Sequence, residues 1–308
     1  MPRMWRPPEG RVTRLLVALW CLAGAAAPAL SVAAEVNDGI PGVASLVDVP
    51  YATVGTRTLL LDLHLPAAAP TLPPLVVYLH GGAWRAGDKA EVPPFLVQRG
   101  YAVASLDFRS SEEAVFPANV HDIKAGIRYL RANAQRYGYR ADRIAVTGSS
   151  SGGHLAALVG VTNGHAELEG AVGEHTAESS SVQAIVTWVG ASNLSTILAQ
   201  STPEGLTIRV PALQLLLGGS PEEVPELTRL ASPVEHVDGN DPPVLILHGD
   251  QDATIPVNQA LELDAAYRRA GLVADLMIIN GVGHVARPFF SGPAADRALE
   301  FLHRTIGR

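Results

Sequence analysis

The sequence contains very little cysteine and few charged residues. Of its 308 residues, one is a cysteine, Cys21, and 17% are charged. If a leader that includes Cys21 is removed, the remaining chain has no disulfide, cysteine nucleophile or thiolate metal site. The formal net charge is −7, and no run of lysine and arginine is present. These absences argue against nucleic acid as a partner, because a nucleic-acid-binding surface needs clustered positive charge.

The first 34 residues differ in composition from the rest. Four arginines among the first 14 residues precede an apolar run from Leu15 to Leu30, and small residues follow before Glu35. This order is typical of a secretory signal peptide. A membrane anchor is the alternative, although the run is shorter than the ~20 residues that a membrane span needs. We expect residues 1–34 to be a signal peptide, 35–308 to form a single catalytic domain, and the processed protein to be exported, periplasmic or secreted, with no stable membrane span.

From about residue 56, apolar runs of strand length alternate with longer amphipathic segments. Continuous apolar runs indicate strands that are buried on both faces. The alternation predicts an α/β fold with a mostly parallel central sheet flanked by helices. The predicted strands are Leu59–Leu65, Leu75–Leu79, Ala102–Asp107, Ile144–Val146, Ala184–Val189, Val244–Leu247 and Ala274–Ile279. The predicted helices are Pro94–Gln98, Ala118–Gln135, Gly153–Gly160, Val257–Ala270 and Ala294–Thr305.

Two stretches, 164–180 and 192–232, break this alternation with glycine, proline, serine and charged residues. Long irregular segments in a compact domain are usually functional or mobile. We therefore expect a small lid-like insertion above the sheet, with passive surface elaboration as the alternative.

Three adjacent serines lie between glycines in Val146–His154, VTGSSSGGH. Gly148, Ser150 and Gly152 form a G-x-S-x-G pattern between a predicted strand and a predicted helix, which is the context of a nucleophile elbow. At the apex of such a turn the middle serine projects from the sheet, and the glycines let neighbouring backbone approach. We predict Ser150 as a nucleophile; a polar turn without chemistry is the alternative.

A serine nucleophile needs a general base and a carboxylate that orients the base. Asp252 follows the predicted strand Val244–Leu247, at the carboxyl end where open α/β sheets bind ligands. His284 lies on a glycine-rich loop after the last predicted strand. The chain order serine, acid, histidine is that of the α/β-hydrolase arrangement. We predict Asp252 as the acid and His284 as the base, with Asp250 as the alternative acid.

The other histidines have simpler explanations. We expect His248 to form only local hydrogen bonds at the end of its strand, and His154 to brace the serine turn from the adjacent helix. The remaining candidates lack the sequence context of a catalytic base: His121, His165 and His175.

A second glycine-rich stretch, His80–Trp84, HGGAW, directly follows an apolar strand. The tetrahedral intermediate of acyl transfer needs N–H donors for its oxyanion, and such a turn lets backbone donors approach. We predict the N–H groups of Gly82 and Ala83 as an oxyanion hole, with the N–H of Ser151 at the start of the following helix as the third donor. Trp84 is predicted either to line a substrate pocket or to belong to the core.

These motifs resemble those of the α/β-hydrolase esterases that carry the pattern His-Gly-Gly-x-Trp, most closely the BD-FAE-type bacterial feruloyl and acetyl esterases that act on plant polysaccharides. The resemblance covers 74–284 and includes HGGAWRAGDK (80–89), FPANVHDIKAGIRYLRANAQRYGYRADRIAVTGSSSGGHLAAL (116–158), ASPVEHV (231–237) and PPVLILHGDQDATIP (242–256). It implies the α/β-hydrolase fold and the same triad of Ser150, Asp252 and His284.

The sequence departs from the family pattern at several positions. Ala83 stands where relatives often have a third glycine, Ser151 where alanine is common, and Ile255 where valine is usual. These three changes keep the backbone roles intact. Residues 191–193, Ala-Ser-Asn, replace a turn that often resembles Pro-Thr-Asp. That change lies near the expected lid and weakens any transfer of substrate preference from the family.

The resemblance implies an exported serine hydrolase that acts through an acyl-enzyme on short-chain or aryl esters, such as acetyl or feruloyl esters. Two alternatives stay open: an amide-directed hydrolase, of the arylformamidase or peptidase type, and an inactive hydrolase fold that only binds ligands. We expect no metal and no cofactor, because no H-E-x-x-H pattern occurs and the ten histidines are scattered. The expected partner is a small-molecule or carbohydrate-linked ester, and no pattern indicates an oligomeric state.

Overall fold

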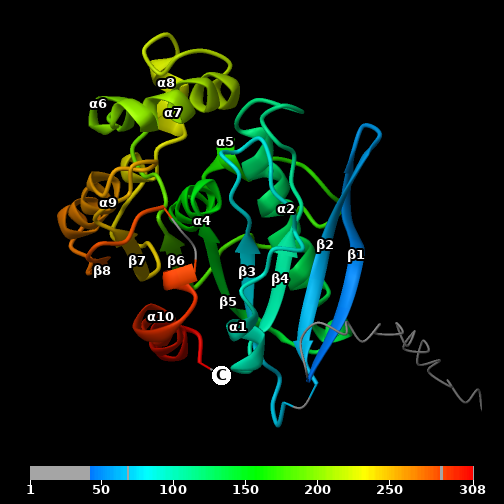
Figure 1. Ribbon diagram of the computed structural model, residues 1–308. Helices are drawn as coiled ribbons and strands as arrows, with labels where there is room; N and C mark the ends of the chain where they lie inside the picture. Colours follow the sequence, from blue (N-terminus) through cyan, green and yellow to red (C-terminus); the bar gives the residue numbers. More distant parts are fainter. Residues whose placement is uncertain (1–41, 68, 285–286, 308) are drawn as a thin grey trace, which may run out of the picture. The chain divides into compact units, whose positions relative to one another are not determined.

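A sheet of eight strands runs through the residues that the computed structural model describes, 42–67, 69–284 and 287–307 (Figure 1). These residues belong to one unit of the chain, Ala33–Arg308. The expected signal peptide, 1–34, lies outside the described residues, and so does Cys21. No helix within the described ranges combines the length and the apolar character that crossing a membrane requires.

The strand order is β1-β2-β4-β3-β5-β6-β7-β8. The six strands from β4 to β8 in this order are parallel, and β1 and β2 are antiparallel at one edge. All seven predicted strands are present, and the bounds differ most at β5. The strands are β1 Val43–Val54, β2 Arg57–Pro66, β3 Pro74–Leu79, β4 Ala102–Leu106, β5 Arg140–Ser149, β6 Ala184–Trp188, β7 Val244–Gly249 and β8 Asp275–Ile279.

The edge strand β1 is not predicted by the sequence pattern. Its pairing with β2 shifts register between Leu46 and Val49 and again between Pro50 and Ala52. Asp48, which lies between Leu46 and Val49, has a φ of 55°. Such bulges place extra residues in one strand and break the alternation of inward and outward side chains by which a strand is recognised in a sequence.

Helices cover both faces of the sheet, and the inner strands β3, β4, β6 and β7 are completely buried between them. The apolar residues of α2, α4 and α9 join one core cluster with Val77, whereas those of α1 and α10 join a second cluster with Val76. Adjacent residues of β3 therefore point into opposite layers, as strand geometry requires. The helices are α1 Pro94–Gln98, α2 Ala118–Ala132, α3 Ala134–Tyr137, α4 Ser151–Val161, α9 Asn258–Arg269 and α10 Gly292–Thr305.

The expected irregular region 192–232 is largely helical, which corrects the sequence interpretation. It contains α6 Ile197–Gln200, α7 Pro203–Leu217 and α8 Pro225–Leu230, whereas 164–180 holds only the short α5 Ala166–Glu169. Figure 1 shows α6, α7 and α8 grouped beyond the carboxyl ends of the parallel strands. Thr202 caps α7 by accepting a hydrogen bond from the N–H of Gly205, and Gly218 ends the helix in the left-handed conformation. These cap signals are visible in the sequence, but Gly205 and Pro211 inside the helix obscure them.

Candidate active site

Ser150 lies in a strained turn between β5 and α4. Its φ is 58° and its ψ is −122°, a conformation that residues with a side chain rarely adopt. Its N–H donates to the carbonyl of Trp188 on the neighbouring strand at 2.9 Å, and its carbonyl accepts from the N–H of His154 at 3.0 Å. The turn therefore has fixed partners on both the sheet and the helix, which hold the strained serine in place.

The glycines that flank Ser150 are required by close backbone contacts. A Cβ atom at Gly148 would lie 2.4 Å from the carbonyl carbon of Gly152. A Cβ atom at Gly152 would lie 2.1 Å from the carbonyl oxygen of Leu79, at the end of β3. Both distances are far below van der Waals contact, so a side chain at either position would displace the serine turn from β3 and α4.

The structure brings together the three predicted triad side chains. The Oγ of Ser150 lies 2.8 Å from the Nε2 of His284. The Nδ1 of His284 lies 2.7 Å from the Oδ2 of Asp252. With Nδ1 protonated towards the carboxylate, Nε2 is the acceptor for the serine hydroxyl proton, which is the tautomer that a general base needs.

Asp252 is held as an ionised carboxylate. Its Oδ1 accepts hydrogen bonds from the N–H groups of Thr254 and Ile255 at 2.9 and 2.8 Å. Burial acts to raise the pKa of Asp252, but interactions with His248 and His284 outweigh burial and hold this pKa well below its ordinary value. The carboxylate therefore stays charged at neutral pH and can accept a hydrogen bond from the Nδ1 of His284.

His248 forms a local hydrogen bond, as expected, but it also contacts the acid. Its Nε2 lies 2.9 Å from the carbonyl oxygen of Ile255 and 3.4 Å from the Oδ2 of Asp252. The position of His248 at the end of β7 could be read from the sequence. Its second contact depends on how the loop 250–255 folds back, which no local pattern indicates.

Asp250, the alternative acid, contacts the loop that carries the histidine instead. Its Oδ1 accepts from the N–H of Gly281 at 2.7 Å, and the N–H of Gln251 donates to the carbonyl of Val282 at 3.0 Å. A Cβ atom at Gly249 would lie 2.0 Å from that same carbonyl oxygen. The acid loop and the histidine loop are thus joined through their backbones, which fixes the separation between Asp252 and His284.

The HGGAW loop lies directly against the serine turn. A Cβ atom at Gly81 would be 3.0 Å from the carbonyl oxygen of Ser149 and 3.4 Å from the Cβ of Ser150. Gly82 and Ala83 have φ angles of 117° and 55°. Their N–H groups have no acceptor among the described residues. The loop therefore has free N–H groups close to the serine, as a site for an oxyanion requires.

Trp84 belongs to the core, which was one of its two predicted locations. Its side chain is 2% exposed, and its Nε1 donates to the Nδ1 of His154 at 3.0 Å. The Nε2 of His154 in turn lies 2.7 Å from the carbonyl oxygen of Ala231. His154 therefore braces the serine turn as predicted, by joining the HGGAW loop to α4 and to the end of the helical region 192–232.

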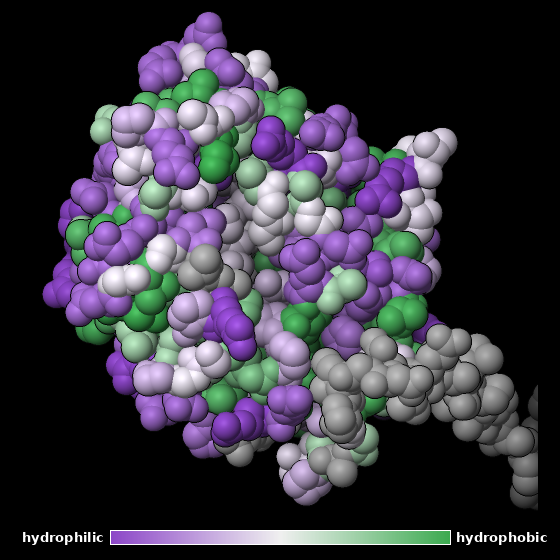
Figure 2. Space-filling model, viewed as in Figure 1, coloured by the Kyte–Doolittle hydropathy of each residue, from purple (hydrophilic) through white to green (hydrophobic). Residues whose placement is uncertain are grey.

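A pocket of about 510 Å³ lies beside the HGGAW loop and the serine turn. Its lining includes Gly81, Gly82 and Ser149, together with the aromatic side chains of Tyr78 and Phe290. On the face shown in Figure 2, hydrophobic residues are scattered among hydrophilic ones rather than gathered in one patch.

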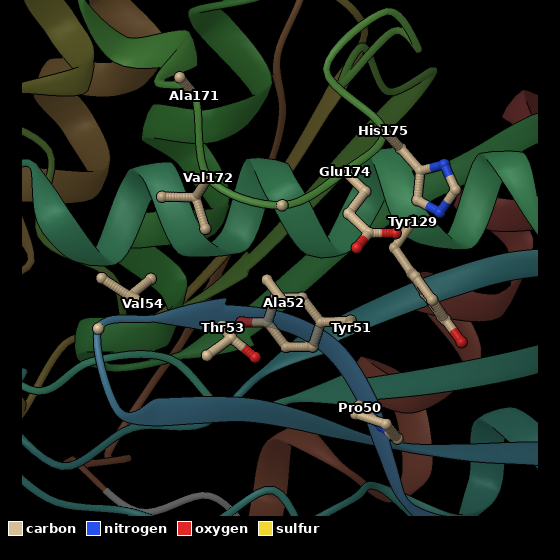
Figure 3. A pocket seen from close by; sticks show the side chains of 12 residues that line it. Pro50, Tyr51, Ala52, Thr53, Val54, Tyr129, Ala171, Val172, Glu174 and His175 are labelled. Atoms are coloured by element: carbon tan, nitrogen blue, oxygen red, sulfur yellow. The ribbon is translucent and has the colours of Figure 1, made fainter.

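A larger pocket of about 670 Å³ lies between β1, α2 and the loop 171–175, and no triad residue lines it. Glu174, His175 and Tyr129 gather at one end of this pocket, and Val172 and Val54 lie at the other (Figure 3). Because its lining holds no nucleophile paired with a base, we place the chemistry at Ser150 despite the larger volume here.

The comparisons with known proteins agree with this fold. The BD-FAE family model matches residues 61–267, more than half of the chain. Esterase LipC of Mycobacterium tuberculosis is 34% identical over 254 residues, which cover 80% of this chain and 62% of LipC. This chain thus spans less than two thirds of the length of that relative.

Among solved structures, a truncated carbohydrate esterase from gut microbiota has a TM-score of 0.77 and 32% identity, over 86% of this chain and 96% of that one. The thermophilic esterase Est2 of Thermogutta terrifontis has a TM-score of 0.67 and 26% identity, over 86% and 91% of the two chains. Since the family model, these structural neighbours and the sheet topology agree, the chain belongs to the BD-FAE family of α/β-hydrolase-fold proteins.

Proposed function

We propose that this protein is a serine carboxylesterase that hydrolyses short-chain or aryl esters, acetyl and feruloyl esters of carbohydrates among them. The observation that carries this proposal is the hydrogen-bonded row from Ser150 through His284 to Asp252, with distances of 2.8 and 2.7 Å. A nucleophile, a base and an orienting acid in contact form the minimal apparatus for acyl transfer.

In the first step, His284 accepts the proton of Ser150 as the Oγ attacks the ester carbonyl carbon. The carbonyl oxygen becomes an oxyanion, which the N–H groups of Gly82, Ala83 and Ser151 stabilise. His284 then donates its proton to the leaving alcohol oxygen as the carbon–oxygen bond breaks. The alcohol departs, and the acyl group remains as an ester on Ser150.

In the second step, a water molecule takes the place of the alcohol. His284 removes a proton from the water, whose oxygen attacks the acyl carbon and forms a second oxyanion at the same N–H groups. Collapse of this intermediate returns the proton from His284 to Ser150 and releases the carboxylic acid. Asp252 stays ionised throughout and stabilises the imidazolium that forms in each step.

The substrate class is supported by the neighbours and by the size of a pocket that lies next to the serine turn and is lined by no triad residue. One structural neighbour is a carbohydrate esterase, and Est2 has been solved with propionate and with butyrate bound. In this chain the pocket of about 510 Å³ beside the HGGAW loop, with Tyr78 and Phe290 in its lining, has room for a short acyl chain or an aromatic ring.

Export is part of the proposal and is supported by the order of basic, apolar and small residues in 1–34. Expression of the full chain in a Gram-negative host, followed by fractionation and N-terminal sequencing, tests it. A periplasmic or secreted protein that begins near Glu35 supports export, and an unprocessed cytoplasmic chain contradicts it.

The activity is tested by measuring kcat/KM on one matched panel with the chain that begins at Glu35. The panel contains acetyl, butyryl, octanoyl and feruloyl esters, an aryl formamide and a prolyl anilide, with Ser150→Ala as the control. We expect serine-dependent turnover to be highest on the acetyl or feruloyl esters. Preference for the formamide or the anilide would instead assign the protein to amide hydrolysis.

Labelling with a fluorophosphonate probe separates two reasons for inactivity. Est2 has been solved after phosphonylation by cyclosarin and by sarin, so a protein of this fold reacts with such reagents. Labelling of the wild type, but not of Ser150→Ala, would show a competent serine whose substrate is outside the panel. No labelling of either protein would overturn the proposed hydrolase activity.

A further inference from the structure

Arg209 is a buried cation for which the described residues show no hydrogen-bond acceptor. It lies on α7, and its side chain is 1% exposed. Its Nε and Nη1 are enclosed and have no partner within the described ranges. Nη2 is not among these enclosed atoms. Ion pairs of other arginines reach carboxylates at 2.7–3.1 Å, for example from Arg109 to Asp122 and from Arg128 to Glu169, but no carboxylate among the described residues does so for Arg209.

An unpaired buried guanidinium is strongly destabilising, because several N–H donors lose water without gaining an acceptor. Burial lowers the pKa of Arg209 to about 10, so the side chain is still a cation at neutral pH. Packing alone does not call for this residue, since the neighbouring buried positions of α7 are filled by Ala212, Leu213 and Leu216.

Part of the missing stabilisation comes from an aromatic ring. The Cζ of Arg209 lies 5.4 Å from the centroid of the Trp84 ring, within the range of a cation–π interaction. This contact involves the face of the guanidinium, whereas the hydrogen-bond donors lie in its plane. Of the in-plane donors, those of Nη2 lie on the one nitrogen that is not enclosed, so they are the donors still open to an anion.

The surroundings place Arg209 near the HGGAW loop and the loop that carries Asp252. Trp84 directly follows the oxyanion-loop residue Ala83. The start of α7 packs on the acid loop, where the Oγ1 of Thr202 donates to the carbonyl of Ala253 at 3.1 Å. The charge of Asp252 raises the pKa of Arg209, although the two groups are not within ion-pair distance. Both oxygens of Asp252 already accept other hydrogen bonds.

We infer that Arg209 is a specificity-determining residue that binds a carboxylate of the substrate, so that the preferred esters carry an anionic carboxyl group close to the scissile bond. A carboxylate accepts charge-assisted hydrogen bonds of the kind that Nη2 can still donate, and no carboxylate among the described residues pairs with Arg209. This inference rests on the proposed ester hydrolysis, and it adds a class of substrate to that activity.

Two pairs of substrates, matched in size and differing in charge, test this inference. For a carboxylate on the acyl side, 4-nitrophenyl hemiglutarate is compared with the corresponding glutaramate. For a carboxylate on the alcohol side, 4-carboxyphenyl acetate is compared with 4-carbamoylphenyl acetate. In the wild type we expect at least one carboxylate ester to exceed its amide partner about tenfold in kcat/KM, and we expect added salt to reduce this ratio.

Three variants assign the preference to Arg209. In Arg209→Met the carboxylate-to-amide ratio of kcat/KM is expected to fall about tenfold. In Arg209→Lys, which keeps the charge without the planar guanidinium, this ratio is expected to fall by less. The matched control is Arg229→Met on α8, whose side chain is 53% exposed and pairs with Glu226. This control is expected to keep the wild-type ratio.

Several outcomes would overturn the inference. If the wild type hydrolyses the neutral esters through Ser150 but shows no preference in either pair, Arg209 binds no carboxylate and the proposed ester hydrolysis still stands. The same conclusion follows if Arg209→Met lowers kcat/KM equally for the carboxylate ester and for its amide partner. If the wild type hydrolyses no member of either pair, the inference about Arg209 fails, and the ester panel with fluorophosphonate labelling decides the proposed hydrolysis separately. Should Arg209→Met not fold, the wild-type ratios and Arg209→Lys still decide the question.

Discussion

The indole Nε1 of Trp84 donates a hydrogen bond to the Nδ1 of His154 at 3.0 Å, 70 residues away in the sequence. Because the Nε2 of His154 is then the protonated nitrogen, it donates to the carbonyl of Ala231 at 2.7 Å. One neutral imidazole thus connects the HGGAW loop, α4 and the segment after α8. Its function follows from having both a donor and an acceptor, which no aliphatic side chain provides.

Replacing this imidazole tests its structural role. His154→Leu leaves the indole N–H of Trp84 and the carbonyl of Ala231 buried without partners. At about 1–3 kcal/mol for each unsatisfied group, we expect the free energy of unfolding to fall by about 3 kcal/mol in urea denaturation. His303→Leu is the control, because His303 is exposed on α10 and its replacement should change stability by less than about 0.5 kcal/mol. Equal effects of the two variants would contradict the bracing role.

The same histidine predicts a loss of stability in acid. Burial lowers the pKa of His154 to about 4, against an ordinary value of 6.5. Between pH 6.5 and pH 4 the unfolded chain therefore binds a proton that the folded protein does not. The contribution of His154 to the free energy of unfolding is complete above pH 6.5. It falls by up to about 3 kcal/mol as the pH is lowered. We expect the unfolding free energies of the wild type and of His154→Gln to converge as the pH falls across this range. Parallel curves would contradict a lowered pKa of His154 in the folded protein.

The parts of the site that the sequence predicts are those at the ends of strands. Ser150 directly follows β5, Asp252 lies three residues after β7 and His284 lies five residues after β8. Parallel strands bring their carboxyl ends to one edge of the sheet. Chain order and local composition were therefore sufficient to place these three side chains near one another. The catalytic roles of these side chains are still predictions, to be decided by the variants below.

The parts that the sequence does not predict depend on contacts between distant segments. The sequence allows two locations for Trp84, and the contacts of its ring with His154 and Arg209 decide between them. The edge strand β1 is hidden by its bulges, and α7 by its internal glycine and proline. An arginine within the apolar run of α7 was a visible signal, but its burial follows only from the packing of that helix on the HGGAW loop.

The choice among the three serines is tested by single substitutions. Ser150→Ala removes the attacking oxygen, so kcat should fall on the order of 10⁶-fold, as is typical when a member of a triad is removed. Ser149→Ala and Ser151→Ala keep their backbone N–H groups and should lose less than about tenfold, because an oxyanion hole uses the main chain there. A severe loss in folded Ser149→Ala would move the nucleophile away from Ser150.

The choice between the two acids is tested in the same assay. Asp252→Asn removes the charge that orients His284 and stabilises its protonated form, so kcat should fall on the order of 10⁴-fold. Asp250→Asn keeps an oxygen that accepts from the N–H of Gly281, and we expect less than a tenfold loss. If Asp250→Asn were the more damaging variant, Asp250 would be the acid and the observed row of hydrogen bonds would not describe the catalytic state.

The serine turn also predicts how sensitive the protein is to a single methyl group. At Gly152 an added Cβ would lie 2.1 Å from the carbonyl oxygen of Leu79, and this backbone neighbour cannot rotate away. Relief of the clash requires β3 and the serine turn to separate, so we expect Gly152→Ala to lower the free energy of unfolding by about 3 kcal/mol. It should also lower kcat, because Ser150 and the HGGAW loop would move apart.

Gly239→Ala is the matched control for this substitution. Its Cβ would meet only the carbonyl oxygen of Ala270, at an ordinary 3.6 Å. Thermal unfolding and kcat are measured on both variants. If Gly152→Ala kept the stability and the kcat of the wild type, the close backbone contact at Gly152 would not constrain the serine turn.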